Sequence, residues 1–204
     1  IVYLDGINPK TQPTTARESG NYSNIELTIP HDWNYETEHG DNANEYCISF
    51  WPADQDEGKI KVWCYTAFGV CGTGLEEKEI TVGAYKARKG TYDNKKVWDF
   101  ISFTDMPGSY VAINEGADKW WNRYGDEAMQ ILGTVKIADG IIDKSQAIEI
   151  AKKGFTAKFD RTDAIFDSEK GLWTGSFYEK NRSEKVQSIT VSYNGKVINK
   201  EAAK

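Results

Sequence analysis

The sequence predicts an α+β protein in which an antiparallel sheet with covering helices is followed by a small helix-plus-antiparallel-sheet unit. Three observations lead to this class. Apolar and polar residues alternate along several early segments, the apolar period changes to 3.6 at residues 117–132, and the composition shifts at Asp139-Gly140. We therefore expect a flexible N-terminal tether at 1–22, an α+β domain at 23–138 and a second domain at 139–204.

The expected strands of the first domain are marked by alternation and by the turn residues that end them. In the segment NIELTIP, for example, Ile25, Leu27 and Ile29 alternate with polar residues before Pro30 ends the run. The polar stretch 31–45 is expected to be an excursion between strands, and 77–93 to be one weak strand and a turn. The other expected strands lie within residues 24–30, 46–52, 59–68, 96–108, 109–116 and 134–140.

A helix is expected at 117–132, because its apolar residues recur at helical spacing and Gly133 follows them. Trp120 and Trp121 are adjacent in this helix and point about 100° apart. We interpret Trp120 as a core residue and Trp121 as partly covered. The alternative stays open that they form an aromatic surface for a peptide, a glycan or the second domain.

The second domain is expected to begin with a helix and to continue with three strands. Asp143 is a favourable N-cap, and Ala147, Ile150 and Ala151 form an apolar stripe along the helix. The strands are expected within residues 155–167, 171–180 and 186–198. The dipeptide Asn194-Gly195 predicts a tight turn in the last of these segments.

The charge distribution excludes some classes of partner. Residues 1–138 contain 13 basic and 21 acidic residues, whereas residues 139–204 contain 12 basic and 10 acidic ones. Neither part has the dense Lys/Arg face that neutralises phosphates, so we expect no nucleic-acid partner. No apolar run approaches the roughly 20 residues of a membrane-spanning helix, so we expect no transmembrane segment.

The opening segment leads to a prediction about location. The chain begins at Ile1 rather than Met, and residues 7–24 are rich in Pro, Thr, Ser and Asn. Such a composition is typical of a tether between an anchor and a folded domain. We therefore expect an extracellular or cell-envelope protein, lipid-anchored through a removed N-terminal segment.

The three cysteines do not form a complete disulfide framework. Cys64 and Cys71 are close enough in sequence to pair across the intervening loop, or both are free thiols, and both alternatives stay open. A catalytic Cys71 would need an imidazole nearby, and the sequence contains only His31 and His39. We expect no catalytic residues, no metal site and no cofactor.

The C-terminal segment resembles the PepSY-like family of small secreted and envelope modules. The resemblance is carried by the helix DKSQAIEIAKK with Ala147 and Ala151, by the strand GLWTGSFYEK with Trp173, and by the ending ITVSYNGKVI. It covers about a third of the chain. The resemblance implies a helix packed on a small antiparallel sheet and a peptide-contacting or protease-restraining role, without catalytic residues.

The N-terminal part resembles a PsbP-type α/β/α sandwich. The shared features are the segment Pro30-His31-Asp32-Trp33 after the first strand, the strand ending FWP, and the helix-to-strand passage AMQILGTVKI. The combination of both units also resembles uncharacterised exported proteins of Gram-positive gut bacteria of the Firmicutes type. Neither fold class implies an enzyme, because fold alone does not supply a function.

We therefore predict a non-enzymatic binding protein that contacts a peptide, a cell-wall component or an envelope protein through a groove or an edge strand. The residues expected nearest the site come from the glycine-rich loop and the aromatic helix: Gly69, Cys71, Gly72, Gly74, Trp120 and Trp121. Cys71 is expected to be a small, buried or disulfide-linked residue at a bend. The alternatives are a structural or assembly module and, more remotely, a thiol-dependent hydrolase that uses Cys71.

Overall fold

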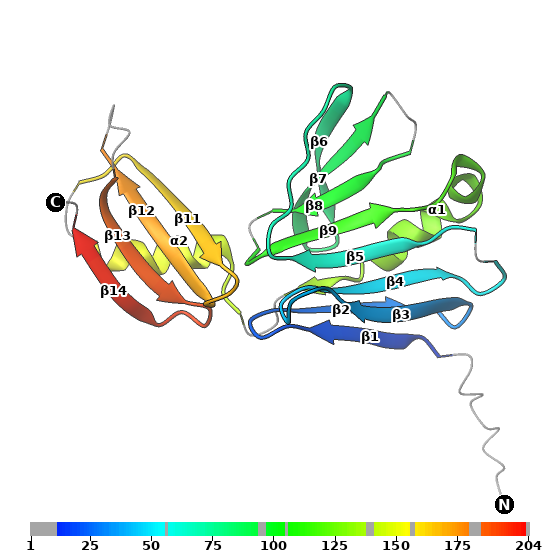
Figure 1. Ribbon diagram of the computed structural model, residues 1–204, viewed down its shortest axis with the longest axis horizontal. Coiled ribbons are helices and arrows are strands. Elements are labelled where there is room, and N and C mark those ends of the chain that lie inside the picture. Colours follow the sequence, from blue (N-terminus) through cyan, green and yellow to red (C-terminus); the bar gives the residue numbers. More distant parts are fainter. Residues whose placement is uncertain are drawn as a thin grey trace, which may run out of the picture.

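Strands dominate the architecture of the chain (Figure 1). The structure is a computed structural model that describes residues 12–55, 57–93, 97–104, 106–137, 141–155, 158–179 and 185–202. Within these residues fourteen strands form three antiparallel sheets, and two α-helices pack beside them. The buried apolar side chains form two separate clusters, one for the N-terminal sheets and one for the C-terminal sheet.

The largest sheet has seven strands in the order β3-β4-β5-β9-β8-β7-β6. Its central strands show the alternation that the sequence predicts: in β5, Ile60, Val62 and Cys64 are buried, and the residues between them are partly exposed. The strands of this sheet are β3 (Trp33–His39), β4 (Tyr46–Pro52), β5 (Ile60–Tyr65), β6 (Leu75–Val82), β7 (Tyr85–Tyr92), β8 (Phe100–Phe103) and β9 (Ser109–Asn114).

We call β1 to β10 together with α1 the N-terminal unit. A small sheet joins the first strands of this unit to its last strand. In it β2 (Asn24–Ile29) pairs with β1 (Thr14–Ser19) on one side and with β10 (Lys136–Ile137) on the other. The predicted tether through residue 22 is wrong for β1, whose Ala16 is fully buried. Alternate residues of β1 face water, which explains its tether-like composition. Residues 1–11 of the predicted tether lie outside the described residues.

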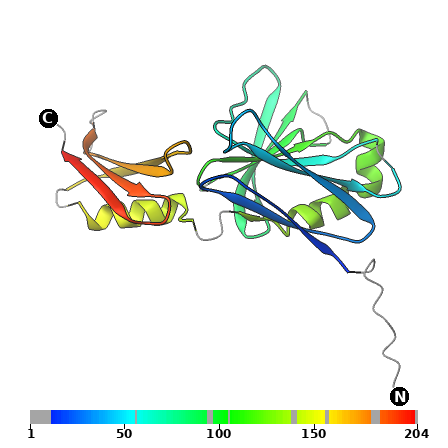
Figure 2. The ribbon, with the colours of Figure 1, turned by 60° about the horizontal axis from the view of Figure 1, so that its bottom comes forward.

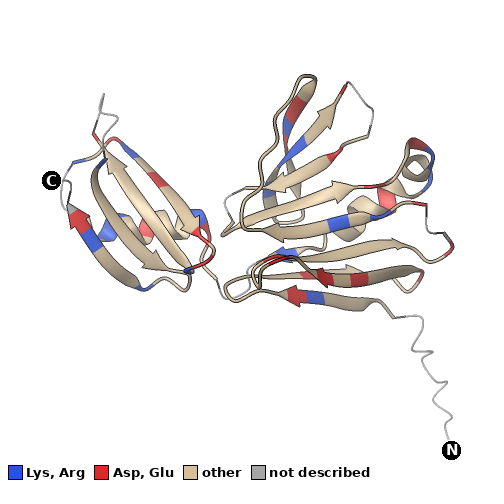
Figure 3. Cartoon of the chain, viewed as in Figure 1, with Lys and Arg blue, Asp and Glu red and all other residues tan. Residues whose placement is uncertain are grey.

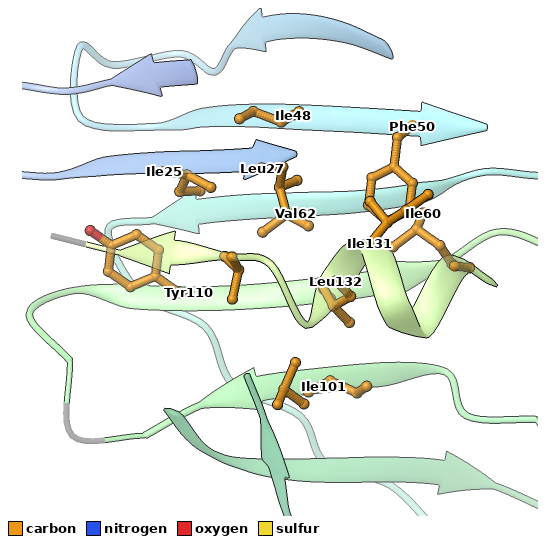
Figure 4. Close-up of a cluster of buried hydrophobic side chains, with 14 of the residues drawn as sticks. Ile25, Leu27, Ile48, Phe50, Ile60, Val62, Ile101, Tyr110, Ile131 and Leu132 are labelled. Atoms are coloured by element: carbon orange, nitrogen blue, oxygen red, sulfur yellow. The ribbon is translucent and has the colours of Figure 1, made fainter. Parts of the chain in front are cut away.

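Helix α1 (Asp118–Leu132) and β2 close the first core against the seven-stranded sheet. Figure 4 shows Ile25 and Leu27 of β2 near Val62 of β5, with Ile131 and Leu132 of α1 beside them. All of these side chains are almost fully buried. The helix prediction is confirmed, and Gly133 is its C-cap.

The C-terminal unit is a four-stranded sheet with one helix on its face (Figure 2). Helix α2 (Lys144–Lys153) begins with a capping box between Asp143 and Gln146, and its buried Ala147 and Ala151 lie against the sheet. The core of this unit is centred on Trp173. The strands, in spatial order, are β11 (Arg161–Asp167), β12 (Leu172–Tyr178), β13 (Lys185–Ser192) and β14 (Val197–Ala202).

The α+β prediction is confirmed only in its coarse form, antiparallel sheets with packed helices, because the described residues are mostly β. The stretch 31–45, predicted as an excursion, contains β3, and 77–93 belongs to the complete hairpin β6–β7. The C-terminal sheet has four strands rather than three. The missed strands β3, β6 and β14 all lie at sheet edges, where both faces are accessible to water and apolar alternation is not required.

Candidate binding cleft

A cavity of about 740 Å³, bordered by described residues, lies where the end of β9 and the start of β8 meet the start of α1. We call it the acidic cleft, because carboxylates outnumber cations on its walls. Its ionisable residues are Glu57, Asp99, Glu115 and Asp118, with Lys119 as the cation, and its aromatic residues are Trp98 and Trp120. Of these residues, only Trp120 is among those that the sequence predicts near the site.

Hydrogen bonds between the Asn114 side chain and the backbone hold the residues that line the cleft. The Asn114 side chain donates to the Trp98 carbonyl (3.0 Å) and accepts from the Gly116 amide (2.9 Å). Residue Ala117 then serves as the N-cap of α1 and provides no side-chain acceptor to the first turn. The first turn of α1, where the positive end of the helix dipole lies, borders the cleft.

Trp120 forms the aromatic wall of the cleft and fits there only because glycine lies next to it. A Cβ added to Gly116 would lie 2.3 Å from Trp120 Cε3, and one added to Gly58 would lie 2.9 Å from its Cγ. The expectation that Trp120 belongs to the core is confirmed, since it is 4% exposed. Trp121 is half-buried, as predicted, and packs edge-on against Trp98 at 5.4 Å.

Two indole N–H groups at the cleft have no acceptor. Among the described residues, Trp98 and Trp120 each hold a buried Nε1 without a hydrogen-bond partner. Buried donors without partners are uncommon, and each costs about 1–3 kcal/mol relative to a paired one. Trp173, in the core of the C-terminal unit, has an unpaired Nε1 as well, so this feature alone does not distinguish the wall of the cleft from a core.

A second cavity of about 290 Å³ adjoins the acidic cleft and shares Glu57 and Glu115 with it. Here the chain binds one of its own ammonium groups. Lys59 Nζ lies 2.9 Å from Glu36 Oε1 and 5.8 Å from the centroid of the Trp51 ring. A carboxylate and an aromatic face thus hold a cation together, as electrostatics favours.

Cross-strand ion pairs continue along the same sheet face. Lys61 Nζ lies 3.4 Å from Glu115 and 3.7 Å from Glu38. Partial burial lowers the pKa of Lys61, but these two carboxylates outweigh that effect and leave it above its ordinary value. Figure 3 shows the acidic segments of β3 and the basic segment of β5 that form these pairs.

The glycine-rich loop occupies a different place from the cleft. Its Phe68 stacks on Tyr65 (6.2 Å) and meets Phe100 edge-on (5.6 Å), so the loop is fixed to the outer face of the large sheet. Gly69 lines a separate cavity of about 270 Å³ that shares no lining residue with the acidic cleft. The structure therefore does not bring together the two groups of predicted site residues.

Two glycines of the loop serve the backbone. Gly72 and Gly74 have φ values of 141° and 83°, which residues with a side chain rarely adopt. The Asp93 amide donates to the Gly74 carbonyl at 3.0 Å, and the Tyr92 hydroxyl donates to the Cys71 carbonyl at 3.3 Å. The loop is thus the bend that the sequence predicts, although β6 begins at Leu75, earlier than expected.

All three cysteines are free, and the open question of a Cys64–Cys71 disulfide is thereby answered. Cys71 is exposed, so the prediction that it is buried or disulfide-linked is wrong. Cys64 is buried instead, with its Sγ 3.7 Å from Ser23 Oγ. Burial raises the pKa of the Cys64 thiol, and it raises the pKa of Cys47 to about 12.

These thiol environments predict selective alkylation. We expect iodoacetamide at pH 8 to modify Cys71 in the native protein, while Cys47 and Cys64 react only after denaturation in urea, because burial keeps them protonated and covered. Intact mass and peptide mapping over time measure this. Labelling of Cys71 much faster than that of an unstructured cysteine peptide would instead support the thiol-hydrolase alternative, and early labelling of Cys64 would contradict the burial.

The histidines have other neighbours. His31 Nδ1 lies 4.0 Å from Asp32, and His39 Nε2 lies 3.1 Å from Glu18. The interactions that we identify for Cys71 involve neither of them. No group of three or more His, Cys, Asp or Glu side chains suited to a metal ion occurs within the described ranges.

Comparison with known proteins gives no relative for this chain: no family model, curated protein or solved structure matches it. The two helices of the described chain are too short or too polar to cross a membrane.

Proposed function

We propose that the chain is a non-enzymatic exported or envelope-tethered binding protein whose acidic cleft takes a basic side chain of a peptide or envelope protein. The observation that carries this proposal is the composition of the cleft, where four carboxylates and one ammonium line a cavity walled by tryptophan. Such a cavity attracts a cation and packs against its alkyl stem. In the finer assignment that we propose, the N-terminal unit, which includes β1, is a PsbP-like domain and the C-terminal unit is a PepSY-like domain.

The adjoining cavity supports the choice of a cationic ligand. There Lys59 lies against Trp51 and Glu36, so the chain itself shows how an ammonium is held at this end of the sheet. The neighbouring acidic cleft offers the same two kinds of group, an indole wall and carboxylates. A lysine or arginine of a partner would meet complementary charge there.

A glycan is less well supported as the ligand. On the large sheet Tyr35 of β3 is an exposed aromatic residue, whereas Trp63, Tyr65 and Phe68 are half-buried and stack with interplanar angles of 14°. Each stacked ring covers one face of its neighbour, so the three half-buried rings offer less open surface to a sugar than separate exposed rings would. A peptide is therefore a better-supported ligand than the saccharide part of a cell-wall component.

One observation favours the assembly alternative. On the C-terminal sheet, Ile165 is 70% exposed and Ile198 on the edge strand β14 is 53% exposed. Exposed apolar groups near a sheet edge are typical of surfaces that meet other proteins. A structural or assembly module would use this sheet and would leave the acidic cleft empty.

Titration calorimetry with a lysine-rich decapeptide tests the proposal. We expect binding that weakens as salt is added, and about tenfold weaker binding by the double variant Glu57→Gln/Asp118→Asn, since a charge-assisted contact contributes about 1.5–3 kcal/mol. The matched control is Glu76→Gln/Glu79→Gln, which removes the same charge from exposed positions on β6. Equal weakening by both double variants, or no binding of the peptide, would exclude the cleft as a cation site.

A further inference from the structure

Contacts between hairpin tips join the N-terminal and C-terminal units. We infer that these contacts form a latch, consisting of Tyr22, Asn44, Ser168, Gly171 and Tyr193, that holds the two units in one orientation. Tyr22 and Asn44 come from the turns β1–β2 and β3–β4, and the other three from the turns β11–β12 and β13–β14. This inference is independent of the ligand proposed above, because none of these five residues lines the acidic cleft.

The aromatic half of the latch depends on a glycine. A Cβ added to Gly171 would lie 2.7 Å from Cδ1 of the Tyr22 ring, so the ring lies directly on the glycine backbone. Tyr22 also contacts the ring of Tyr193, with centroids 5.2 Å apart. The Tyr193 amide donates to the Gly171 carbonyl at 2.8 Å, which makes the two tips of the C-terminal unit a single surface for Tyr22.

The polar half is a side-chain amide that is held on both sides. Asn44 Nδ2 donates to the Ser168 carbonyl at 3.1 Å, across the junction between the units. Asn44 Oδ1 accepts from the Asn21 amide at 3.2 Å, and this amide precedes Tyr22 in the chain. The aromatic and polar contacts are therefore linked through one short turn, so that each positions the other.

The direct connection between the units adds a third restraint. Ile141 packs against the first core, and the next residue, Ile142, packs against the second. The Ile142 amide also donates to the Tyr193 carbonyl at 2.9 Å. Two consecutive residues anchored in different cores leave little length of chain for a hinge at this point.

These restraints oppose the relative motion of the two units that a small interface would ordinarily allow. Two units joined by few contacts ordinarily move relative to each other. Here one ring pair, one amide hydrogen bond and the Ile141–Ile142 connection act together, because Tyr193 and the turn at Tyr22 link them. Linked contacts must break together before the units can turn, so a few of them suffice to hold the orientation.

Backbone ¹⁵N relaxation of the whole chain tests the latch. In the wild-type protein we expect amides of both units to report one rotational correlation time. In Tyr22→Ala the C-terminal unit should acquire a shorter correlation time than the N-terminal unit, whereas Tyr22→Phe, which keeps the ring, should behave as wild type. Asn44→Ala removes the side-chain hydrogen bonds with Ser168 and Asn21 and should shift the correlation time in the same direction as Tyr22→Ala.

The wild-type measurement decides the proposal even where a variant folds poorly. Two different correlation times in the wild-type chain would overturn the latch, as would a Tyr22→Ala protein with unchanged chemical shifts in both cores and one common correlation time. A loss of amide dispersion in Tyr22→Ala would show that the variant misfolds. The comparison would then rest on wild type, Tyr22→Phe and Asn44→Ala.

Discussion

Replacing Trp173 with alanine is expected to unfold the C-terminal unit while the N-terminal sheets remain folded. Trp173 is 2% exposed and is the largest member of a small core, where it packs on Phe166 with ring centroids 5.0 Å apart. Truncating a buried tryptophan costs about 3–5 kcal/mol, and a unit of this size has little stability to spare. Amide resonances of residues 141–202 should lose dispersion, and those of the seven-stranded sheet should keep it.

The control for this prediction is Ile165→Ala in the same sheet. Ile165 is also a large apolar residue, but it is 70% exposed, so its truncation should change the free energy of unfolding by no more than about 0.5 kcal/mol. A Trp173→Ala protein with a native spectrum and an unchanged urea midpoint would show that the second core does not depend on this side chain. Simultaneous unfolding of both units would show that the two cores are one cooperative unit.

The second large effect is expected from Gly83→Ala, in the turn of the hairpin β6–β7. Gly83 has φ +57°, and a Cβ there would lie 2.4 Å from the carbonyl oxygen of Gly133 at the end of α1. A left-handed alanine costs about 1–2 kcal/mol, and moving the helix end away from the turn adds to this. We expect a total loss of about 2–4 kcal/mol in the free energy of unfolding.

Urea denaturation measures this loss, and Gly69→Ala is its matched control. A Cβ at Gly69 meets no atom within 4 Å, so this variant should unfold at nearly the wild-type urea concentration. Similar midpoints for both variants would contradict the close approach of the turn to α1. A strongly destabilised Gly69→Ala would give the glycine-rich loop a structural importance that its contacts do not explain.

The sequence predicted those elements whose local pattern agrees with their place in the fold. Strands β2 and β5 have one face in the core, so their alternation is visible in the residues themselves. Helix α2 carries its own start signal in Asp143 and its own apolar stripe. Edge strands such as β3 and β6 show no such pattern, because pairing with a neighbouring strand, rather than burial of alternate residues, forms them.

The candidate site could be predicted only where one element supplies it. Trp120 and Trp121 are adjacent in α1, and their different burial follows from helix geometry. The carboxylates that complete the cleft, Glu57, Asp99 and Glu115, lie far apart in the sequence and meet only because β5, β8 and β9 are neighbours in one sheet. Gly116, just before the helix, was a local signal of this site in the sequence. Its role could not be predicted, because that role depends on the Trp120 indole, which lies on the glycine.

The sequence by itself determined the central strands, the two helices and the bend at Gly72 and Gly74, because alternation, capping and backbone freedom are properties of neighbouring residues. Only the tertiary structure decided that Cys71 is exposed and unpaired, that the glycine-rich loop and the aromatic helix lie apart, and that acidic residues gather beside Trp98 and Trp120. The physical reason is that exposure and charge clustering depend on strand order, and strand order depends on long-range pairing.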